Sequence, residues 1–276
     1  MNGCYQPIKS KIEKIIDETP NIKTFVIRPQ QPIKFSAGQF IELTLPGIGE
    51  APFTPSSSPQ VEDTLEVTVM RAGVVTNSLH AASVGATVGI RGPFGKRYPL
   101  DEFFGKEIHL IGGGVGMAPL RSLLLALMSE ISNFKKIILN YGAKTPADIV
   151  YKDQFKEWRK IKGLEISFCV DNASPYDNWA DKVGVVTCLL DDLSKGKEDK
   201  SSIISVVCGP PIMMKFATLK ILEQNYKPEN IYLSMEKNMS CGLGKCGHCA
   251  VGQYFVCKDG PVFTYAQLKD HPELWA

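Results

Sequence analysis

The chain has 276 residues, of which 44% are hydrophobic and 22% are charged, and this length predicts two domains with a small appendage. The formal net charge of +2 gives no strong field for nucleic acid or an anionic membrane. No run reaches about 18 uncharged apolar residues and the N-terminus lacks the apolar core of a signal peptide, so we expect a cytoplasmic protein without a membrane span, in reducing conditions.

The first hundred residues read as a β-domain. Short β-type runs alternate with turns, and the clearest of these runs are IKTFVIRP, GQFIELTLPG, LEVTVMRAG and VGATVGIRGPFG. Proline and glycine interrupt them about every ten residues, which is typical of small antiparallel barrels and sandwiches. We therefore assign residues 1–100 to an N-terminal antiparallel β-barrel.

After residue 101 the pattern changes to alternating strands and helices. The strand-like runs are EIHLIGGG, KKIILNYG, LEISFCVD and SIISVVCGPP, and the helical ones are PLRSLLLALMSEI, QFKEWRKIKG and IMMKFATLKILEQN. This alternation implies parallel strands with right-handed crossovers, so residues 102–228 predict an α/β nucleotide-binding domain with a parallel sheet. The C-terminal segment, residues 229–276, begins with one more strand-like run, IYLSME, and continues as a glycine- and cysteine-rich tail with too few apolar residues for its own core.

A glycine-rich loop joins the first of these strands to its helix, and its glycines are Gly112, Gly113, Gly114 and Gly116. Glycines let the backbone approach a diphosphate, and the helix N-terminus supplies unpaired N–H groups, so the loop predicts a dinucleotide site. The GxGxxG fingerprint is absent, because Met117 stands at its third glycine and no acid ends the second strand. Lys144, just past that strand, is a candidate for an adenosine 2′-phosphate or simply a solvated side chain.

The fourth strand ends in Cys208-Gly209-Pro210-Pro211. Because the carboxyl ends of parallel strands face the ligand crevice, we expect Cys208, Gly209 and Pro210 near the dinucleotide. Taken alone, Cys208 is better explained as a small buried hydrophobic residue.

Four of the eight cysteines lie in the tail, at Cys241, Cys246, Cys249 and Cys257. The first three have the C-x4-C-x2-C spacing of plant-type [2Fe–2S] ferredoxins, whose thiolates bind iron. A structural zinc remains the competing interpretation, although zinc ribbons favour two C-x2-C pairs and the tail has one. A Rieske centre needs two histidine ligands, and only His248 lies nearby, which we expect to be a loop residue or a hydrogen-bond donor.

The β-domain followed by GGGVGMAPLRS and CGPPIMM resembles the ferredoxin-NADP reductase superfamily over nearly the whole chain. The tail resembles its branch of flavin and iron–sulfur electron-transfer subunits, which includes the gamma subunits of sulfhydrogenases and the corresponding subunits of anaerobic sulfite reductase and dihydroorotate dehydrogenase B. The resemblance implies FAD on the β-domain, NAD(P)H as substrate on the α/β domain and a [2Fe–2S] cluster on the four tail cysteines. The segments GEAPFTPSSSP and CGLGKCGHCAVGQYFVCKDGPVF look most like the hydrogenase and sulfite reductase types.

The resemblance also implies flavin contacts. The family's Arg-x-Tyr-Ser segment corresponds to Ala51-Pro52-Phe53-Thr54, so Phe53 is expected against the isoalloxazine ring and Thr54 near its N5 atom. Ala51 replaces the arginine that pairs with the flavin phosphate, and we expect Arg71 to substitute for it. A turn with free N–H and hydroxyl donors is expected beside Arg71, at Gly73, Val75, Thr76 and Asn77; otherwise Arg71 is a solvated strand-end charge.

Together these parts predict an NAD(P)H:acceptor oxidoreductase that converts a two-electron donor into single electrons. NAD(P)H gives up a hydride, a cluster takes one electron at a time, and a flavin exchanges both. We expect the nicotinamide to meet the flavin between Cys208 and Thr54, with hydride transfer from nicotinamide C4 to flavin N5 over roughly 3–3.5 Å, then single-electron exit through the cluster. With no substrate pocket recognisable, we expect a catalytic partner of hydrogenase, sulfur reductase or sulfite reductase type to dock near the cluster.

Two alternatives stay open at this stage. One is the electron-transfer subunit of dihydroorotate dehydrogenase B. The other belongs to a different class, a zinc-stabilised binding module that senses nucleotide levels. The residues leave the choice between NAD and NADP, the identity of the partner and the physiological direction undecided.

Overall fold

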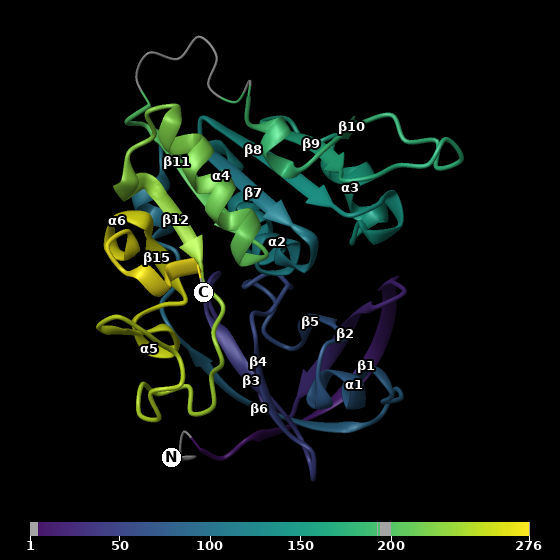
Figure 1. Ribbon diagram of the computed structural model, residues 1–276. Helices are drawn as coiled ribbons and strands as arrows, with labels where there is room; N and C mark the ends of the chain where they lie inside the picture. Colours follow the sequence, from purple (N-terminus) through teal and green to yellow (C-terminus); the bar gives the residue numbers. More distant parts are fainter. Residues whose placement is uncertain (1–4, 192, 194–199, 276) are drawn as a thin grey trace. The chain divides into compact units, whose positions relative to one another are not determined.

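The computed structural model describes residues 5–191, 193 and 200–275 (Figure 1). The chain forms two compact units, each assembled from segments far apart in the sequence. The first unit comprises Met1–Tyr98, Arg121–Ala126 and Met235–Val262, and the second comprises Pro99–Leu120, Leu127–Ser234 and Phe263–Ala276. The loop that carries the four clustered cysteines therefore shares a unit with the N-terminal β-domain.

The first unit is built on a six-stranded antiparallel sheet of order β4-β3-β6-β1-β2-β5. Its strands are β1 (Ile8–Thr19), β2 (Ile22–Pro29), β3 (Phe40–Leu45), β4 (Gly49–Phe53), β5 (Leu65–Met70) and β6 (Thr87–Phe94). The backbone N–H of Ser56 donates to the carbonyl of Glu66 at 2.7 Å, so the segment after one edge strand pairs with the other edge strand. The sheet thus closes around one apolar core that includes Phe25, Ile27, Ile41, Leu43, Leu65 and Val67.

Strand β1 has one solvated face, and one short helix follows β5. In β1 the buried positions alternate with lysines and acids, as expected of a strand with one solvated face. Helix α1 (Val74–His80) buries Leu79 in the core of the sheet.

The second unit contains a seven-stranded sheet of order β10-β9-β8-β7-β11-β12-β15. Its strands are β7 (Glu107–Gly113), β8 (Lys136–Ala143), β9 (Leu164–Val170), β10 (Lys182–Val183), β11 (Ile203–Cys208), β12 (Ile231–Ser234) and β15 (Val262–Thr264). In this order, the strands from β10 through to β12 pair in parallel. The central strands β8 and β11 are buried along almost their whole length, because helices cover both faces of the sheet.

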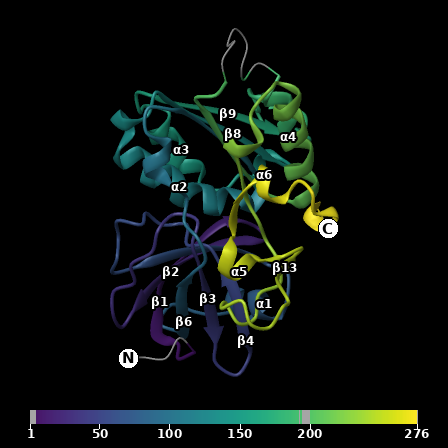
Figure 2. The same cartoon turned by 90° about the vertical axis from the view of Figure 1, so that its left-hand side faces the viewer.

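Three helices cover this sheet: α2 (Met117–Ser129), α3 (Lys152–Trp158) and α4 (Pro211–Glu223). Figure 2 shows α2 and α3 on one side of β8 and β9 and α4 on the other. Helix α2 buries a leucine stripe at helical spacing, namely Leu120, Leu123, Leu124 and Leu127. No helix in the described ranges is long and apolar enough to cross a bilayer.

The cysteine-rich tail forms only short elements: β13 (Ala250–Val251), β14 (Tyr254–Phe255), α5 (Val256–Asp259) and α6 (Tyr265–Leu268). Strands β13 and β14 make a small antiparallel hairpin. The tail has no core of its own and instead packs on residues after β6, where Lys96 bridges to Pro261. The predicted fold class is confirmed in the same order: antiparallel β-sheet, α/β sheet with parallel strands, and cysteine-rich segment.

Candidate functional site

The two loops predicted to hold a dinucleotide lie at one edge of the second sheet. Strands β7 and β11 are parallel neighbours, and their register pairs Gly112 with Cys208. A Cβ atom built on Gly116 would lie 2.5 Å from the carbonyl oxygen of Cys208, so only glycine fits where the loops meet. The structure therefore brings the glycine loop and the Cys208-Gly209-Pro210 loop together into one rim.

A cavity of about 800 Å³ opens at this rim, inside the second unit. Four of the predicted residues line it, namely Gly113, Gly114, Lys144 and Pro210. Gly112, Gly116 and Cys208 are buried, whereas Gly209 is partly exposed. Helix α4 adds apolar side chains that face the cavity although they are exposed, with Ile212 at 62%, Phe216 at 55% and Leu219 at 40%. Such a mixture of backbone donors and apolar walls suits a nucleotide.

Opposite charges stand side by side on the cavity wall. The N–H of Asp171 donates to the carbonyl of Ala143 at 2.9 Å, and that of Asn172 donates to the carbonyl of Lys144 at 3.0 Å. These bonds extend the β8–β9 ladder by one residue on each strand, which places Lys144 beside Asp171. Both residues line the cavity. Sequence reasoning missed Asp171 because it looked for an acid at the end of the second strand, whereas this acid ends the third.

The side chain of Tyr141 on β8 holds the glycine loop in place. Its hydroxyl donates to the carbonyl of Gly114 at 3.0 Å and accepts from the N–H of Val150 at 3.4 Å. The tyrosine ring is fully buried. The loop therefore keeps its shape through a side chain from the neighbouring strand, which the sequence pattern did not reveal.

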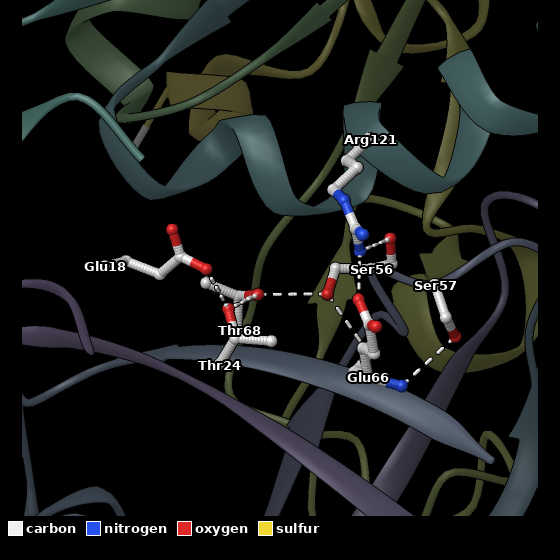
Figure 3. Close-up of polar contacts among 7 residues, drawn as sticks. All are labelled: Glu18, Thr24, Ser56, Ser57, Glu66, Thr68 and Arg121. Carbon is white, nitrogen blue, oxygen red and sulfur yellow. Dashed lines mark hydrogen bonds and ion pairs between the residues drawn. The ribbon is translucent and has the colours of Figure 1, made fainter. Parts of the chain in front are cut away.

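The predicted flavin residues Phe53 and Thr54 lie at the end of β4, and both are half-buried. Phe53 packs against the core of the first unit. Just beyond them, Arg121 donates to the carbonyl of Ser56 at 2.7 Å and pairs with the carboxylate of Glu66 (Figure 3). The buried arginine therefore clamps the segment that follows Thr54.

A chain of hydroxyl groups continues this clamp across the sheet. The Ser56 hydroxyl bonds to Thr68 at 2.9 Å, Thr68 to Thr24 at 2.8 Å, and Thr24 to the Glu18 carboxylate at 2.8 Å. Figure 3 shows these contacts running from Arg121 to Glu18. The backbone two residues after Thr54 is thus fixed by side-chain contacts, which suits a segment that holds a rigid aromatic cofactor. None of these supporting residues was predicted.

The segment after Arg71 corrects one expectation. Residues 73–77 form the N-cap and first turn of α1 rather than an irregular turn. The Thr76 hydroxyl accepts from the N–H groups of Ala72 and Gly73, both at 2.8 Å, and donates to the Gly73 carbonyl at 3.0 Å. That hydroxyl is therefore not a free donor, because it caps the helix. Arg71 is exposed at the end of β5.

Backbone amides surround the sulfurs of the cysteine loop. Cys241 Sγ accepts from the N–H groups of Leu243 at 3.3 Å and Lys245 at 3.4 Å. Cys257 Sγ accepts from the N–H of Gly244 at 3.1 Å, and Cys249 Sγ accepts from the N–H of Cys257 at 3.4 Å. Donors aimed at sulfur stabilise thiolates, so the loop is built for sulfur atoms that carry negative charge.

Side-chain hydrogen bonds link Cys241 to Cys246 and Cys249 to Cys257, and the charges of Cys257 and Cys241 also interact. Burial alone would raise the pKa of Cys241, but hydrogen bonds from the backbone of Leu243, Lys245 and Cys246 and from the Cys246 thiol lower it to about 6. Burial and the neighbouring Cys249 thiol raise the pKa of Cys257 to about 12. Cys257 therefore becomes a thiolate only when a metal centre offsets its charge.

The two pairs differ in exposure. Cys249 and Cys257 are each 1% exposed, whereas Cys246 lies on the surface with Lys245, Gly247 and His248. The His248 ring bonds to the Ser240 hydroxyl at 2.9 Å. Within the described ranges no three His, Cys, Asp or Glu side chains converge on a single-ion site.

Three protein families match successive parts of the chain. They are the oxidoreductase FAD-binding domain at residues 9–98, the oxidoreductase NAD-binding domain at residues 110–218, and the iron–sulfur cluster binding domain of dihydroorotate dehydrogenase B at residues 236–269. The matches follow the order of the two sheets and the cysteine loop.

Whole-length relatives agree with these matches. Sulfhydrogenase 1 subunit gamma of Pyrococcus furiosus is 33% identical over 273 residues, covering 96% of this chain and 92% of the relative. A probable dihydroorotate dehydrogenase B (NAD(+)) electron transfer subunit of Methanocaldococcus jannaschii is 34% identical over 270 residues, with 96% and 92% covered. The structure of an NADH-dependent reduced ferredoxin-NADP oxidoreductase superimposes with a TM-score of 0.77 at 29% identity, covering 99% of this chain and 93% of that one.

The resemblance drawn from the sequence motifs is confirmed, and so is the expectation of an oxidoreductase that uses FAD, a nicotinamide nucleotide and an iron–sulfur cluster. The chain belongs to the ferredoxin-NADP reductase superfamily, in the branch of NAD(P)H-dependent flavin and iron–sulfur electron-transfer subunits that includes those of sulfhydrogenases and dihydroorotate dehydrogenase B.

Proposed function

We propose that this chain takes a hydride from NAD(P)H, passes electrons singly through a [2Fe–2S] cluster, and delivers them to a catalytic redox subunit or accepts them from it. When bound, FAD supplies the exchange between hydride and single electrons. The observation that supports the proposal is the set of four clustered cysteines, three of whose sulfurs accept hydrogen bonds from backbone N–H groups, in the same unit as the sheet matched as FAD-binding.

The spacing and the contacts of the thiols support a two-iron cluster. A two-iron cluster takes four thiolates, two on each iron. Cys241 with Cys246 and Cys249 with Cys257 supply two such pairs, and their sequence spacing is that of plant-type ferredoxins. A single zinc would need all four sulfurs around one point. We therefore assign these four cysteines as ligands of a [2Fe–2S] cluster.

The nucleotide is assigned to the rim of the second sheet. Its diphosphate would meet the N–H groups of the glycine loop and the following helix, α2, with Pro210 and Gly209 on the other side. Its adenosine end would reach Lys144 and Asp171, and the apolar face of α4 would cover the base. The glycine-loop residues in this role are Gly112, Gly113, Gly114 and Gly116.

The flavin is assigned to the first unit. Phe53 would pack on the isoalloxazine ring and Thr54 would hydrogen-bond near N5, both held by the Arg121 clamp. The flavin phosphates would meet Arg71 and the start of α1, at Gly73, Val75, Thr76 and Asn77. We assign the hydride-transfer step to Thr54 on the flavin side and Cys208 on the nucleotide side.

The exposed edge of the cysteine loop is the exit for electrons. Cys246 is on the surface, flanked by Lys245 and His248, while Cys249 and Cys257 are buried. A partner with an acidic surface around its own redox centre would bring that centre closest to Cys246. Relatives named as subunits of sulfhydrogenase and of dihydroorotate dehydrogenase B match over 96% of this chain, so these two kinds of partner are the first and second candidates.

Anaerobic purification tests the proposal. We expect flavin absorption together with iron and inorganic sulfide in equal amounts, about two of each per chain, and a catalytic redox protein that co-purifies. A colourless protein that contains zinc instead of iron would overturn the proposal. Recovery with a dihydroorotate dehydrogenase would leave the cofactor assignments in place and select the second candidate.

A further inference from the structure

A buried charge cluster lies where the cysteine loop packs on the first sheet. Arg91 on β6 is 5% exposed. Its Nε donates to both carboxylate oxygens of Glu50 at 2.9 and 3.2 Å, and its Nη2 donates to Glu50 at 2.6 Å. The remaining nitrogen, Nη1, donates to the backbone carbonyl of Cys241 at 3.4 Å. One guanidinium thus joins a carboxylate of the sheet to the first cysteine of the loop.

A second carboxylate faces the same arginine. Glu42 on β3 is the register partner of Arg91 on β6 and of Pro52 on β4. It is fully buried, and neither of its oxygens has a hydrogen-bond partner in the described part of the chain. Arg91 is therefore placed among two acids and a cysteine, and no apolar residue could replace that charge without leaving both acids uncompensated.

The loop is fitted closely to this arginine. Gly242, next to Cys241, has φ +72°, and a Cβ atom on it would lie 2.9 Å from the ring of Phe94. The Arg91 guanidinium carbon lies 5.5 Å from the centre of that same ring. Arg91 and Phe94 therefore form the surface on which the Cys241 end of the loop rests.

Burying an ion pair costs several kcal/mol per ion in desolvation. Apolar side chains in place of both the arginine and its acids would therefore stabilise the sheet equally well. A buried arginine at this position is better explained by what it does to the loop. A fixed positive charge beside iron ligands favours the cluster state with the extra electron, since that state carries more negative charge.

We propose that Arg91 is a positioning residue that fixes the Cys241 end of the cluster loop and raises the reduction potential of the cluster, with Glu50 orienting the guanidinium and offsetting part of its charge. The inference rests on the proposed function, because it takes Cys241 as an iron ligand.

The test is an EPR-monitored redox titration of the cluster in intact holoprotein, with the flavin potential measured in the same sample. Arg91→Gln removes the positive charge and should shift the cluster potential downward. Glu50→Gln removes the carboxylate that pairs with the arginine and should shift the cluster potential upward. Arg91→Lys keeps the charge and should recover most of the wild-type potential. Arg28→Gln is the matched control, because Arg28 pairs with Glu13 on the exposed face of the same sheet, and it should shift nothing.

The outcomes separate the possibilities. Opposite shifts for Arg91→Gln and Glu50→Gln, with an unchanged flavin potential, support the proposal. Shifts in the same direction, or none, overturn it, because a merely structural role would not depend on the sign of the charge. If Arg91→Gln loses iron while keeping flavin, the anchoring role is supported and the Glu50→Gln shift decides the electrostatic role. A wild-type protein without iron would instead refute the proposed function.

Discussion

The rim proposed for the dinucleotide and the cysteine loop proposed for the cluster are built in two different ways. The rim is made from the ends of regular parallel strands, where Gly112 and Cys208 meet because β7 and β11 are in register. The loop has almost no regular structure and gets its shape from amide-to-sulfur bonds and from the Arg91–Phe94 surface. A site at strand ends follows from the topology, whereas a site on a loop depends on individual contacts.

The substitution Cys249→Ala should separate the functions of the two regions most clearly. Loss of a buried ligand should remove the cluster and lower electron delivery to the partner by about 100-fold or more, because the remaining three thiolates cannot satisfy two irons. NAD(P)H oxidation with an artificial flavin oxidant should stay within about twofold. Steady-state assays with both acceptors measure this, and Cys188→Ala, outside the tail, is the control. Equal loss of both activities would contradict the order of carriers.

Glu42 offers a test of the sheet beneath the cysteine loop. Burial raises the pKa of Glu42 from 4.5 to about 7, and Arg91 opposes this only in part. The folded state therefore binds the proton more tightly than the unfolded chain. This tighter proton binding adds about 3 kcal/mol to the free energy of unfolding. The contribution is complete below about pH 4.5 and is lost as pH rises through about 7.

Denaturant unfolding between pH 5 and 8 measures this effect. The wild type should lose stability over that range, and Glu42→Gln should flatten the loss, since its amide does not ionise. Arg91 and Glu50 remain unchanged in both proteins and serve as the common background. A Glu42→Gln profile parallel to that of the wild type would show that this carboxyl is not the group responsible.

At the rim, Gly116→Ala probes the close approach of the two loops. The added Cβ would press on the Cys208 carbonyl, so the loops must separate at a cost of about 1–3 kcal/mol. We expect KM for NAD(P)H to rise about tenfold, whereas the visible spectrum of the cluster should not change. Isothermal titration with the oxidised nucleotide checks the same effect on binding alone. Unaltered binding would mean that the diphosphate does not use this rim.

The substitution Asp171→Ala tests whether the cavity wall sets the preference between NADH and NADPH. A carboxylate beside the adenosine ribose accepts hydrogen bonds from its hydroxyls and repels a 2′-phosphate, while Lys144 attracts one. Removing the acid should raise the ratio of kcat/KM for NADPH over that for NADH by about tenfold, a change of about 1.4 kcal/mol. Lys144→Ala should change the ratio in the opposite sense. If neither variant moves the ratio, the adenosine end binds elsewhere.

The smallest effect is expected for Arg71→Ala. Arg71 is exposed, and charge contacts at the surface are weak, so flavin retention should fall only a few-fold. Flavin content after gel filtration measures this. Unchanged content would mean that the arginine missing at Ala51 is compensated by another group.

Sequence reasoning predicted the fold because its signals are periodic. The runs of apolar residues in β7, β8 and β11 and the leucine stripe of α2 have the spacing of buried strands and helices. Strand β1 was not predicted from the sequence, because lysines and acids fill its exposed positions. The short elements of the tail were not predicted either, because they depend on packing against the sheet rather than on a hydrophobic pattern in their own sequence.

The same contrast applies to the site residues. The glycine loop and the cysteines were predicted as site residues from their spacing, since the chemistry expected of them fixes the residue type. Arg121 is a lone charge inside an apolar helix, and its partners Ser56 and Glu66 lie more than 50 residues away in the chain. Arg91 likewise meets Cys241 across 150 positions. Contacts at that separation become visible only in three dimensions.

The central claim is that a pair of electrons enters at the nucleotide rim and leaves singly through iron on the cysteine loop. Rapid mixing of the anaerobic holoprotein with NADH or NADPH, followed by optical and EPR detection, tests it most directly. We predict that flavin absorption falls first and that the EPR signal of a reduced two-iron cluster then appears. A cluster that stays oxidised beside fully reduced flavin, or a tail that holds no iron, would contradict the account.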